Sequence, residues 1–503
     1  MSRNFIINQI DEWAKKDPER VCFKDGESSY SYKQLKRDSD TLANHFINSL
    51  EKNEPILIFG GIYYEMVVSF LAAMKAGHPY IPVDSQTPLD RVEMIISVAK
   101  PSCIIAWDEL SIDTTTKFIN RVQAESILRD DKSIELKNVI SGDDVMYIIF
   151  TSGTTGVPKG VQITFNNLTD HLDWLMNNFG FEEGDKFLAQ TSYSFDVSVM
   201  ITYPCLLNGG VLNPVSKELI GNFNDLFIAL KKMDLNIWIS TPSFVEICLL
   251  DPNFNGDNYP NLKSFILAGE ELKHSLAETL VNRFPNAETI NAYGPTEATI
   301  IVTKMVITPE LLAKSERLPI GEIKTGTGMY IVDDEGNKLP DGQVGELIID
   351  GPTISPGYLN NPEKTAEAFF DMDGIPSYHS GDAAYIKDGI VYYQGRIDFQ
   401  IKLHGYRIEL EDVEHNLNKV SYVKTCTVVP KYKEHKVQQL VAYVVANPHD
   451  FEKDFKLSKA IKEEMKHHVM DYMIPQKFVY VDALPLTPNG KVDRKKLIAE
   501  VNN

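Results

Sequence analysis

The loop from Thr151 to Gly160 combines small side chains, hydroxyl groups and a lysine in the order Thr-Ser-Gly-Thr-Thr-Gly-Val-Pro-Lys-Gly. Glycine lets a backbone approach an anion closely, hydroxyl groups donate hydrogen bonds, and Lys159 adds positive charge, so this composition favours contact with phosphate. The loop is not a P-loop, because only two residues separate Gly153 from Gly156 where that motif needs four. Taken alone, the loop could equally be a solvated turn.

Four further polar turns lie downstream of this loop. They are Asn291–Glu297, Ser380–Asp382, Gly395–Asp398 and Pro488–Lys491. Each turn is a weak signal by itself. Taken with the loop at 151–160, their order and identity resemble the core motifs of the adenylate-forming superfamily, which includes nonribosomal peptide synthetase adenylation domains, acyl-CoA synthetases and luciferases. The resemblance covers essentially the whole chain.

The resemblance implies a reaction in which a carboxylate attacks the α-phosphate of ATP and pyrophosphate leaves. Because negative groups must then be brought together, the site needs cations. The resemblance implies that Lys491 supplies charge at the reacting carboxylate and α-phosphate, and that Glu297 holds Mg²⁺ against the phosphates. Without the other motifs, Lys491 would be interpreted as a solvated lysine and Glu297 equally well as a surface glutamate.

The nucleoside part of ATP would be held by the middle motifs. Asp382 has two acceptor oxygens for the ribose hydroxyls, and Arg396 would add a second ribose or phosphate contact. Tyr293 would offer a face for adenine, although core packing is the alternative for this residue. The backbone at Asn291 and Ala292 would contact the base edge. The full set of expected ATP contacts is Thr151, Ser152, Gly153, Thr154, Thr155, Lys159, Asn291, Ala292, Tyr293, Gly294, Pro295, Thr296, Asp382, Tyr393, Gln394, Gly395, Arg396 and Lys491.

Asp196 indicates the class of acid that is activated. It lies in an otherwise apolar and aromatic stretch, and a carboxylate there needs a compensating cation or hydrogen-bond donors. The ammonium group of an amino acid would be that cation. A helix-capping aspartate is the competing interpretation.

The pocket for the substrate side chain is expected to include Ala268, Gly269 and Ile300, with Lys491 at the carboxylate. Bulk at Ile300 and Met200 would leave little room, which favours alanine over a large side chain. Relatives often carry cysteine where this chain has Ala268, so no single residue accounts for a preference for the D isomer. Ser380 replaces the usual threonine and keeps a small hydroxyl.

A closer resemblance lies in the segments 193–200, 240–244 and 396–402. These are most similar to ligases that activate D-alanine and load it onto the phosphopantetheine thiol of a D-alanyl carrier protein, which implies a role in D-alanylation of teichoic acids. Adenylation of another small amino acid is an alternative. An acyl-CoA synthetase would leave Asp196 unexplained, and a non-catalytic nucleotide-binding regulator would not need Lys491 and Glu297.

Transfer to a carrier protein implies a second conformation. The resemblance implies that a small C-terminal domain turns at Asp398 and brings in the loop Gly405–Arg407. A carrier protein is expected to be acidic, so it would dock on locally basic surface, although a charged helix face is usually only solvated. The basic residues nominated for this surface are Lys459, Lys462, Lys466, Arg494, Lys495 and Lys496.

Composition limits the other possibilities. The chain has 503 residues, 43% of them hydrophobic, and a formal net charge of −20, which argues against nucleic acid as a partner. The N-terminal residues lack the apolar core of a signal peptide, and no apolar run reaches the length of a membrane span, so a cytoplasmic location is expected. Five separated cysteines are interpreted as buried and reduced, because none lies in a motif.

The spacing of apolar residues predicts the scaffold, an α/β fold. A strand at 56–59, a helix at 66–76 capped by Gly77, and a strand at 80–83 form a β-α-β unit, and similar alternation recurs up to residue 290. This predicts parallel sheets covered by helices. Turn residues at 333–336, 340–342 and 351–352 predict hairpins in a β-rich subdomain at about 305–395. The large domain is expected at 1–398, with a small, mobile α+β domain at 399–503.

Overall fold

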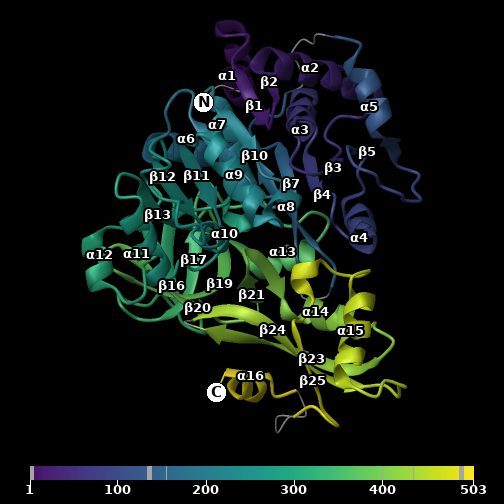
Figure 1. Ribbon diagram of the computed structural model, residues 1–503, viewed down its shortest axis with the longest axis vertical. Coiled ribbons are helices and arrows are strands. Elements are labelled where there is room, and N and C mark those ends of the chain that lie inside the picture. The colour runs from purple at the N-terminus through teal and green to yellow at the C-terminus, as the bar shows by residue number, and fades with distance from the viewer. Residues whose placement is uncertain are drawn as a thin grey trace. The chain divides into compact units, whose positions relative to one another are not determined.

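The computed structural model describes residues 5–132, 139–153, 156–398, 400–433, 435–485 and 492–502 (Figure 1). Contacts divide the chain into two compact units. The larger unit comprises Met1–Ser85, Val98–Phe150 and Gly160–Gly395, and the smaller unit comprises Gln86–Ser97, Thr151–Lys159 and Arg396–Asn503. The hinge and domain boundary at Asp398 remain predictions.

A six-stranded sheet is built from the N-terminal third of the described residues, in the order β6-β5-β3-β4-β7-β8. The pairs from β6 to β7 are parallel. The predicted β-α-β unit is confirmed, with α3 (Tyr64–Ala76) between β3 and β4 and with Gly77 as its left-handed cap. The six strands are β3 (Ile56–Gly60), β4 (Tyr80–Asp84), β5 (Cys103–Ala106), β6 (Lys117–Ile119), β7 (Val145–Thr151) and β8 (Lys159–Thr164).

The helices of the N-terminal third are tied to one another by a buried ion cluster. The Lys75 ammonium on α3 is fully buried and lies 3.0 Å from Asp11 on α1 and 2.7 Å from Asp40 on α2. Breaking one member of such a cluster would leave a buried charge without compensation. Besides α3, the helices of this region are α1 (Phe5–Lys16), α2 (Tyr32–Ser49), α4 (Leu89–Ala99), α5 (Arg121–Leu128) and α6 (Phe165–Asn178).

A second sheet contains fourteen strands among the described residues. The strands β1, β10, β9, β11, β12 and β13 pair in parallel, as the alternating pattern predicts. The strands of this sheet are β1 (Val21–Asp25), β2 (Ser28–Ser31), β9 (Lys186–Ala189), β10 (Val211–Pro214), β11 (Ile237–Ser240), β12 (Ser264–Leu267), β13 (Glu288–Tyr293), β14 (Thr303–Val306), β15 (Gly321–Ile323), β16 (Gly328–Val332), β17 (Gly345–Asp350), β18 (Phe369–Met372), β19 (Ile375–Lys387) and β20 (Ile390–Arg396).

The β-rich region predicted at about 305–395 corresponds to the antiparallel part of this sheet, but its turns differ from expectation. The turns at 333–336 and 340–342 both lie in one connection, because β16 pairs directly with β17. The turn at 351–352 is not a hairpin, since the chain passes through α13 and β18 before β19 pairs with β17. The helices here are α7 (Val197–Leu207), α8 (Lys217–Ile220), α9 (Phe223–Met233), α10 (Pro242–Cys248), α11 (His274–Arg283), α12 (Pro309–Lys314) and α13 (Pro362–Ala368).

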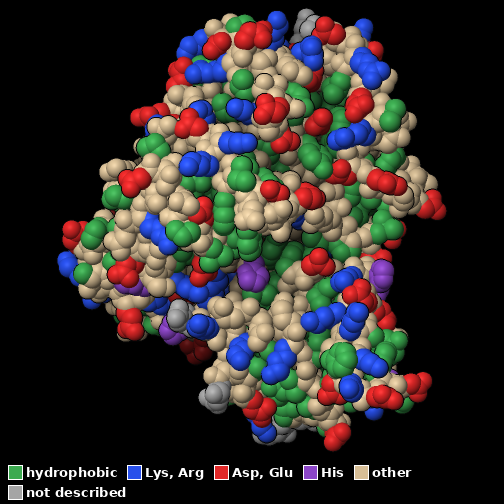
Figure 2. Space-filling view, viewed as in Figure 1, with side chains coloured by type: hydrophobic (Ala, Val, Ile, Leu, Met, Phe, Trp, Pro, Cys, Tyr) green, Lys and Arg blue, Asp and Glu red, His purple; other side chains and the backbone are tan. Residues whose placement is uncertain are grey.

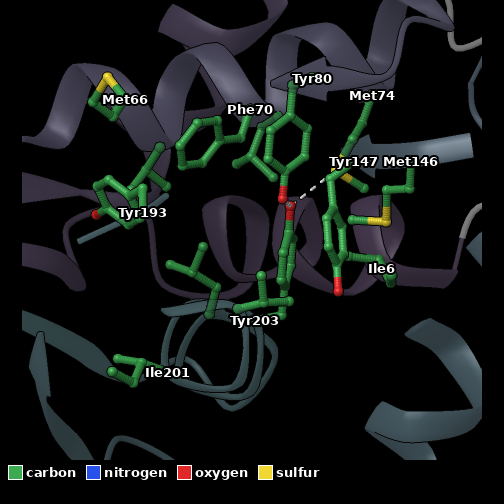
Figure 3. Close-up of a cluster of buried hydrophobic side chains, with 14 of the residues drawn as sticks. Ile6, Met66, Phe70, Met74, Tyr80, Met146, Tyr147, Tyr193, Ile201 and Tyr203 are labelled. Carbon is green, nitrogen blue, oxygen red and sulfur yellow. Dashed lines mark hydrogen bonds between the residues drawn. The ribbon is translucent and has the colours of Figure 1, made fainter. Parts of the chain in front are cut away.

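One hydrophobic cluster joins the two sheets of the larger unit. It contains side chains from β3 and β7 of one sheet, from β9 and β13 of the other, and from α3 and α7. Figure 3 shows part of this cluster, in which the aromatic rings of Phe70, Tyr80, Tyr147, Tyr193 and Tyr203 gather. Helix α7 is buried along its whole length, so its first residues are held by the core.

The smaller unit has a core of its own and the α+β character predicted for it. Its three-stranded sheet pairs β23 antiparallel with β24 and β24 parallel with β25. Helices α14 and α15 pack their apolar faces into this core. The elements are β21 (Gln400–Leu403), β22 (Tyr406–Glu409), α14 (Leu410–Leu417), β23 (Val423–Lys433), β24 (Lys436–Ala446), α15 (Asp454–Met465), β25 (Lys477–Tyr480) and α16 (Arg494–Asn502).

Surface and core composition agree with the sequence analysis. Acidic and basic side chains are interspersed over the face drawn in Figure 2. All five cysteines are free and buried, and burial raises the pKa of the Cys103 thiol to about 12. Such thiols are poor nucleophiles. Among the described helices, none has the length and apolar character that crossing a bilayer requires.

A buried histidine predicts acid sensitivity of the larger unit. His171 on α6 is fully buried, neither ring nitrogen has a hydrogen-bond partner among the described residues, and burial together with Lys324 lowers its pKa to about 3. At a pH below 6.5, the ordinary pKa of histidine, His171 is protonated in the unfolded chain but stays neutral in the folded chain, so stability is lost as the pH falls. When the pH falls from 6.5 to 5, we expect the free energy of unfolding, measured with urea, to decrease by about 2 kcal/mol less in His171→Leu than in the wild type. Equal losses would contradict this.

Candidate functional site

Two predicted substrate residues, Ala268 and Gly269, lie at the carboxyl edge of the parallel strands of the large sheet. Strands β11, β12 and β13 are parallel and in register, with Ser240 beside Leu267 and Leu267 beside Asn291, so their carboxyl ends line up. Ala268 and Gly269 follow β12 directly, and Glu297 lies just beyond β13. Ligands of open α/β sheets bind at this carboxyl edge.

The residues predicted to bind the nucleoside come together from three strands of the large sheet, β13, β19 and β20. Tyr293 ends β13, and its hydroxyl donates a hydrogen bond to Asp382 on β19. The ring of Tyr393 on β20 lies 6.3 Å from that of Tyr293. Asp382 is buried, and its backbone N–H is fixed by the Ser380 hydroxyl at 3.0 Å. The structure thus places an aromatic face and a buried carboxylate together, although their contact with a nucleotide remains a prediction.

The turn after β13 has a backbone that few sequences could adopt. A Cβ at Gly294 would lie 2.5 Å from the Ile301 Cα and 2.6 Å from the Ile300 carbonyl oxygen, so this position needs glycine. Thr299 and Ile300 have φ angles of 61° and 75°. Positive φ is an outlier for β-branched residues and costs of order 1–3 kcal/mol. Such strain is typical of functional sites.

Glu297 is fully buried, so the surface interpretation of this residue is wrong. Its carboxylate accepts a hydrogen bond from the Tyr358 hydroxyl at 2.9 Å, and its backbone carbonyl accepts one from the Ser355 N–H at 2.8 Å. Within the described ranges, no group of three or more His, Cys, Asp and Glu side chains could hold a metal ion. A cation here would therefore need oxygens from a ligand as well.

Asp196 stands immediately before the buried helix α7. It occupies the N-cap position, but its φ and ψ angles are helical and its side chain makes no capping hydrogen bond. The capping interpretation therefore fails for this residue. A partly buried carboxylate at this place suits a cationic group of a ligand.

The predicted side-chain pocket residues belong to one apolar cluster. Ala268 and Ile300 are 1% and 2% exposed, and both belong to the cluster that contains Met200 from α7 and Ala292 from β13. Gly269 follows with a φ of 86°. Ala268 and Ile300 are therefore tightly packed, and their role in a side-chain pocket remains a prediction.

The smaller unit holds the loop at 151–159 and its own set of contacts. The Ser152 hydroxyl donates to the Arg407 carbonyl at 2.9 Å, and the Lys159 ammonium lies 3.8 Å from Glu409. The Thr151 hydroxyl is buried without a hydrogen-bond partner in the described part of the chain. A Cβ at Gly153 would lie 2.1 Å from the Val157 carbonyl oxygen, so the turn itself requires this glycine.

Arg396 and Asp398 are paired with each other in this structure. The Arg396 guanidinium donates from Nε to one Asp398 oxygen at 2.8 Å and from Nη2 to the other. Burial would raise the pKa of Asp398, but the Arg396 hydrogen bonds and the Gln400 backbone N–H hold it below its ordinary value. The predicted nucleotide ligand and the predicted hinge thus form one ion pair.

Sequence comparison agrees with this geometry. The profile of the AMP-binding enzyme family matches residues 10–359, and that of the AMP-binding enzyme C-terminal domain matches residues 412–491. The chain belongs to the AMP-binding enzyme family. A relative from Lacticaseibacillus paracasei, named "D-alanine--D-alanyl carrier protein ligase", is 50% identical to it, and the match covers 99% of each protein.

Solved structures share the fold of this AMP-binding enzyme. An adenylation domain from Vibrio cholerae in complex with glycyl-adenosine-5'-phosphate matches with a TM-score of 0.85 at 21% identity, covering 100% of this chain and 98% of that one. An artificially fused adenylation and PCP di-domain from Klebsiella oxytoca matches with a TM-score of 0.81 at 23% identity, covering 95% and 94%.

Some expected residues of this AMP-binding enzyme lie outside the described residues. They are Thr154, Thr155 and Lys491, the last with its whole motif Pro488–Lys491. Asn291 is described, and its side-chain amide donates to the Pro319 carbonyl at 2.8 Å. Gln394 and Gly395 lie on strand β20.

Sequence reasoning missed two residues that touch the expected site of this AMP-binding enzyme. Tyr358 donates to Glu297 from 61 positions away in sequence. Arg317 forms a two-point ion pair with Glu271 and places its guanidinium 5.4 Å from the Tyr393 ring. No local pattern marks either residue, because each contact joins distant parts of the chain.

The Tyr293–Asp382 hydrogen bond can be tested in this AMP-binding enzyme without a ligand. Tyr293→Phe removes one donor from a buried carboxylate, so we expect a loss of about 1–3 kcal/mol in the free energy of unfolding. Tyr392→Phe on the neighbouring strand β20 is the matched control, since no hydrogen bond of its hydroxyl is seen in the described chain. Equal stability of the two variants by urea unfolding would contradict a structural role for this bond.

Proposed function

We propose that this chain is an ATP-dependent ligase that activates D-alanine as D-alanyl-adenylate and transfers the alanyl group to the phosphopantetheine thiol of a D-alanyl carrier protein. The observation that carries the proposal is Asp196, a carboxylate that does not cap its helix, next to a helix that shares an apolar cluster with Ala268 and Ile300. The full-length relative at 50% identity supports the choice of substrate and carrier.

In the first step the substrate carboxylate attacks the α-phosphorus of ATP, and the bond to pyrophosphate breaks. Asp382 would accept the ribose hydroxyls, Tyr293 would stack on adenine, and Asp196 would bind the ammonium group. Lys491 would approach the reacting carboxylate and the α-phosphate, where its charge stabilises the transition state. The product is a mixed anhydride that must be kept from water.

Mg²⁺ is proposed as the metal of this step. Glu297 fits such a role because it is a fully buried carboxylate, an oxygen ligand of the kind that Mg²⁺ prefers. Magnesium usually keeps few protein ligands and takes others from phosphates and water, which agrees with the lack of a three-residue cluster among described residues. Its charge would offset that of the phosphate oxygens.

In the second step the thiol of the carrier protein attacks the acyl carbon, AMP leaves and a thioester forms. The thiol proton must go to a base or to water. We propose that a change of conformation at Asp398 permits this step, and that the carrier protein uses the basic side chains of α15 and α16. We propose that the loaded carrier supplies D-alanine for teichoic acids of the cell wall and that the enzyme acts in the cytoplasm.

The substrate assignment is tested by ATP/pyrophosphate exchange with D- and L-amino acids and short fatty acids. We expect D-alanine to give the highest kcat/KM and fatty acids to give none. Asp196→Asn should lower kcat/KM for D-alanine by about 10- to 100-fold, because a charge-assisted bond contributes about 1.5–3 kcal/mol, while ATP binding stays intact. An Asp196→Asn enzyme with the wild-type KM for the amino acid would refute the role of Asp196.

The two half-reactions can be separated by two variants. Lys491→Ala should abolish most ATP/pyrophosphate exchange, because it removes the cation at the reacting phosphate. Asp398→Pro should leave exchange near the wild-type rate and impair thioester formation on the phosphopantetheinylated carrier, because proline fixes φ where the hinge must turn. Equal losses of both half-reactions in Asp398→Pro would argue against a hinge.

A further inference from the structure

We infer that Asp84 is a positioning residue for the amino-acid subsite, because it fixes the segment that carries Asp196. The inference rests on the proposed function, since it concerns the binding of the substrate ammonium group. Asp84 ends strand β4 of the six-stranded sheet, whereas Asp196 follows β9 of the other sheet. Their connection therefore bridges the two sheets of the larger unit.

Three hydrogen bonds join the end of β4 to the segment before Asp196. The Ser192 hydroxyl donates to the Asp84 carboxylate. The Asp84 backbone N–H donates to the Ser194 hydroxyl at 2.8 Å, and this hydroxyl donates to the Pro82 carbonyl at 3.3 Å. Both serines, two and four residues before Asp196, are thus held by one strand end.

Charge and burial make this connection rigid. The Asp84 side chain is 8% exposed, and its other oxygen lies 3.2 Å from the ammonium of Lys217, the first residue of the four-residue helix α8. One oxygen is therefore held by a cation and the other by Ser192. A buried carboxylate compensated from two directions has little freedom to move, so it defines where Ser192 lies.

The far side of the same segment is fastened to β4 as well. The Tyr80 hydroxyl at the start of β4 is hydrogen-bonded at 2.8 Å to the Tyr203 hydroxyl on α7. The Phe70 ring stacks on Tyr80 at 4.5 Å and meets the edge of Tyr193 at 5.0 Å. Figure 3 shows the Tyr80 and Tyr203 hydroxyls meeting, with Phe70 between Tyr80 and Tyr193. Asp196 lies between these two points of attachment in sequence.

The nucleotide residues are positioned by other elements. Tyr293, Asp382 and Tyr393 lie on β13, β19 and β20, where the Tyr293 hydroxyl donates to Asp382 and the Tyr293 and Tyr393 rings lie 6.3 Å apart. Loss of the Asp84 contacts should therefore displace Asp196, the proposed ligand of the substrate ammonium group, and leave the residues that are proposed to bind the nucleotide in place. A displacement of about 1 Å at a positioning residue can reduce activity by about 10²-fold.

The experiment measures KM for D-alanine and KM for ATP separately, by pyrophosphate exchange with the full-length enzyme. Asp84→Ala and Ser192→Ala should each raise KM for D-alanine, by about 10-fold or more for Asp84→Ala, with KM for ATP unchanged. Asp84→Asn keeps an acceptor for Ser192 and should recover part of the affinity. Ser192→Ala removes a single oxygen atom, so it still tests the inference if the Asp84→Ala protein does not fold.

Asp185 provides the matched control. Like Asp84, Asp185 is buried, and it forms an ion pair with Lys263 at 2.9 Å. Asp185 lies just before strand β9, whereas Ser192 lies just after it. Asp185→Ala should therefore lower thermal stability about as much as Asp84→Ala and leave both KM values unchanged.

Two results would overturn the inference. One is an unchanged KM for D-alanine in both Asp84→Ala and Ser192→Ala. The other is an equal rise of both KM values in these variants, which would indicate general loosening of the unit. Exchange by the wild type with D-alanine tests the proposed function separately, because it does not depend on any Asp84 variant.

Discussion

The larger unit depends on keeping carboxylates that are buried also hydrogen-bonded. Asp84, Glu297 and Asp382 are all buried, and each accepts a hydrogen bond from a hydroxyl of another element, Ser192, Tyr358 and Tyr293 respectively. A buried carboxylate without a partner costs several kcal/mol, so these contacts fix both the donor and the acceptor. The result is three oriented acceptors, at the end of β4 for Asp84, just beyond β13 for Glu297 and within β19 for Asp382.

This constraint separates the tasks of the proposed reaction. Asp382 with Tyr293 suits a nucleoside, Glu297 suits a metal–phosphate group, and Asp196 suits an ammonium group. The segment that carries Asp196 is attached, through the serines that precede it, to the strand end at Asp84. In the smaller unit the pairing of Arg396 with Asp398 occupies two residues that the proposed two-step cycle would use in turn.

Much of the scaffold could be predicted from the sequence, because its signals are local. The apolar runs at 56–59 and 80–83, the helix between them and the cap at Gly77 all follow from spacing and from glycine at a left-handed position. The hairpin predicted at 351–352 is wrong, since strand pairing and not turn composition decides which turn closes a hairpin. The roles of Tyr293 and Asp382 came from a resemblance, and their hydrogen bond, which joins positions 89 apart, could not be inferred. The side chain of Asp196 could be distinguished from a helix cap only by its backbone angles and contacts.

The central claim is that these turns surround one acyl-adenylate. A crystal structure of the enzyme with a non-hydrolysable analogue of D-alanyl-adenylate tests it most directly. The account predicts the ammonium group at hydrogen-bond distance from Asp196, the ribose hydroxyls on Asp382 and the adenine against Tyr293. A bound analogue whose ammonium group is far from Asp196, or whose ribose does not contact Asp382, would contradict the account.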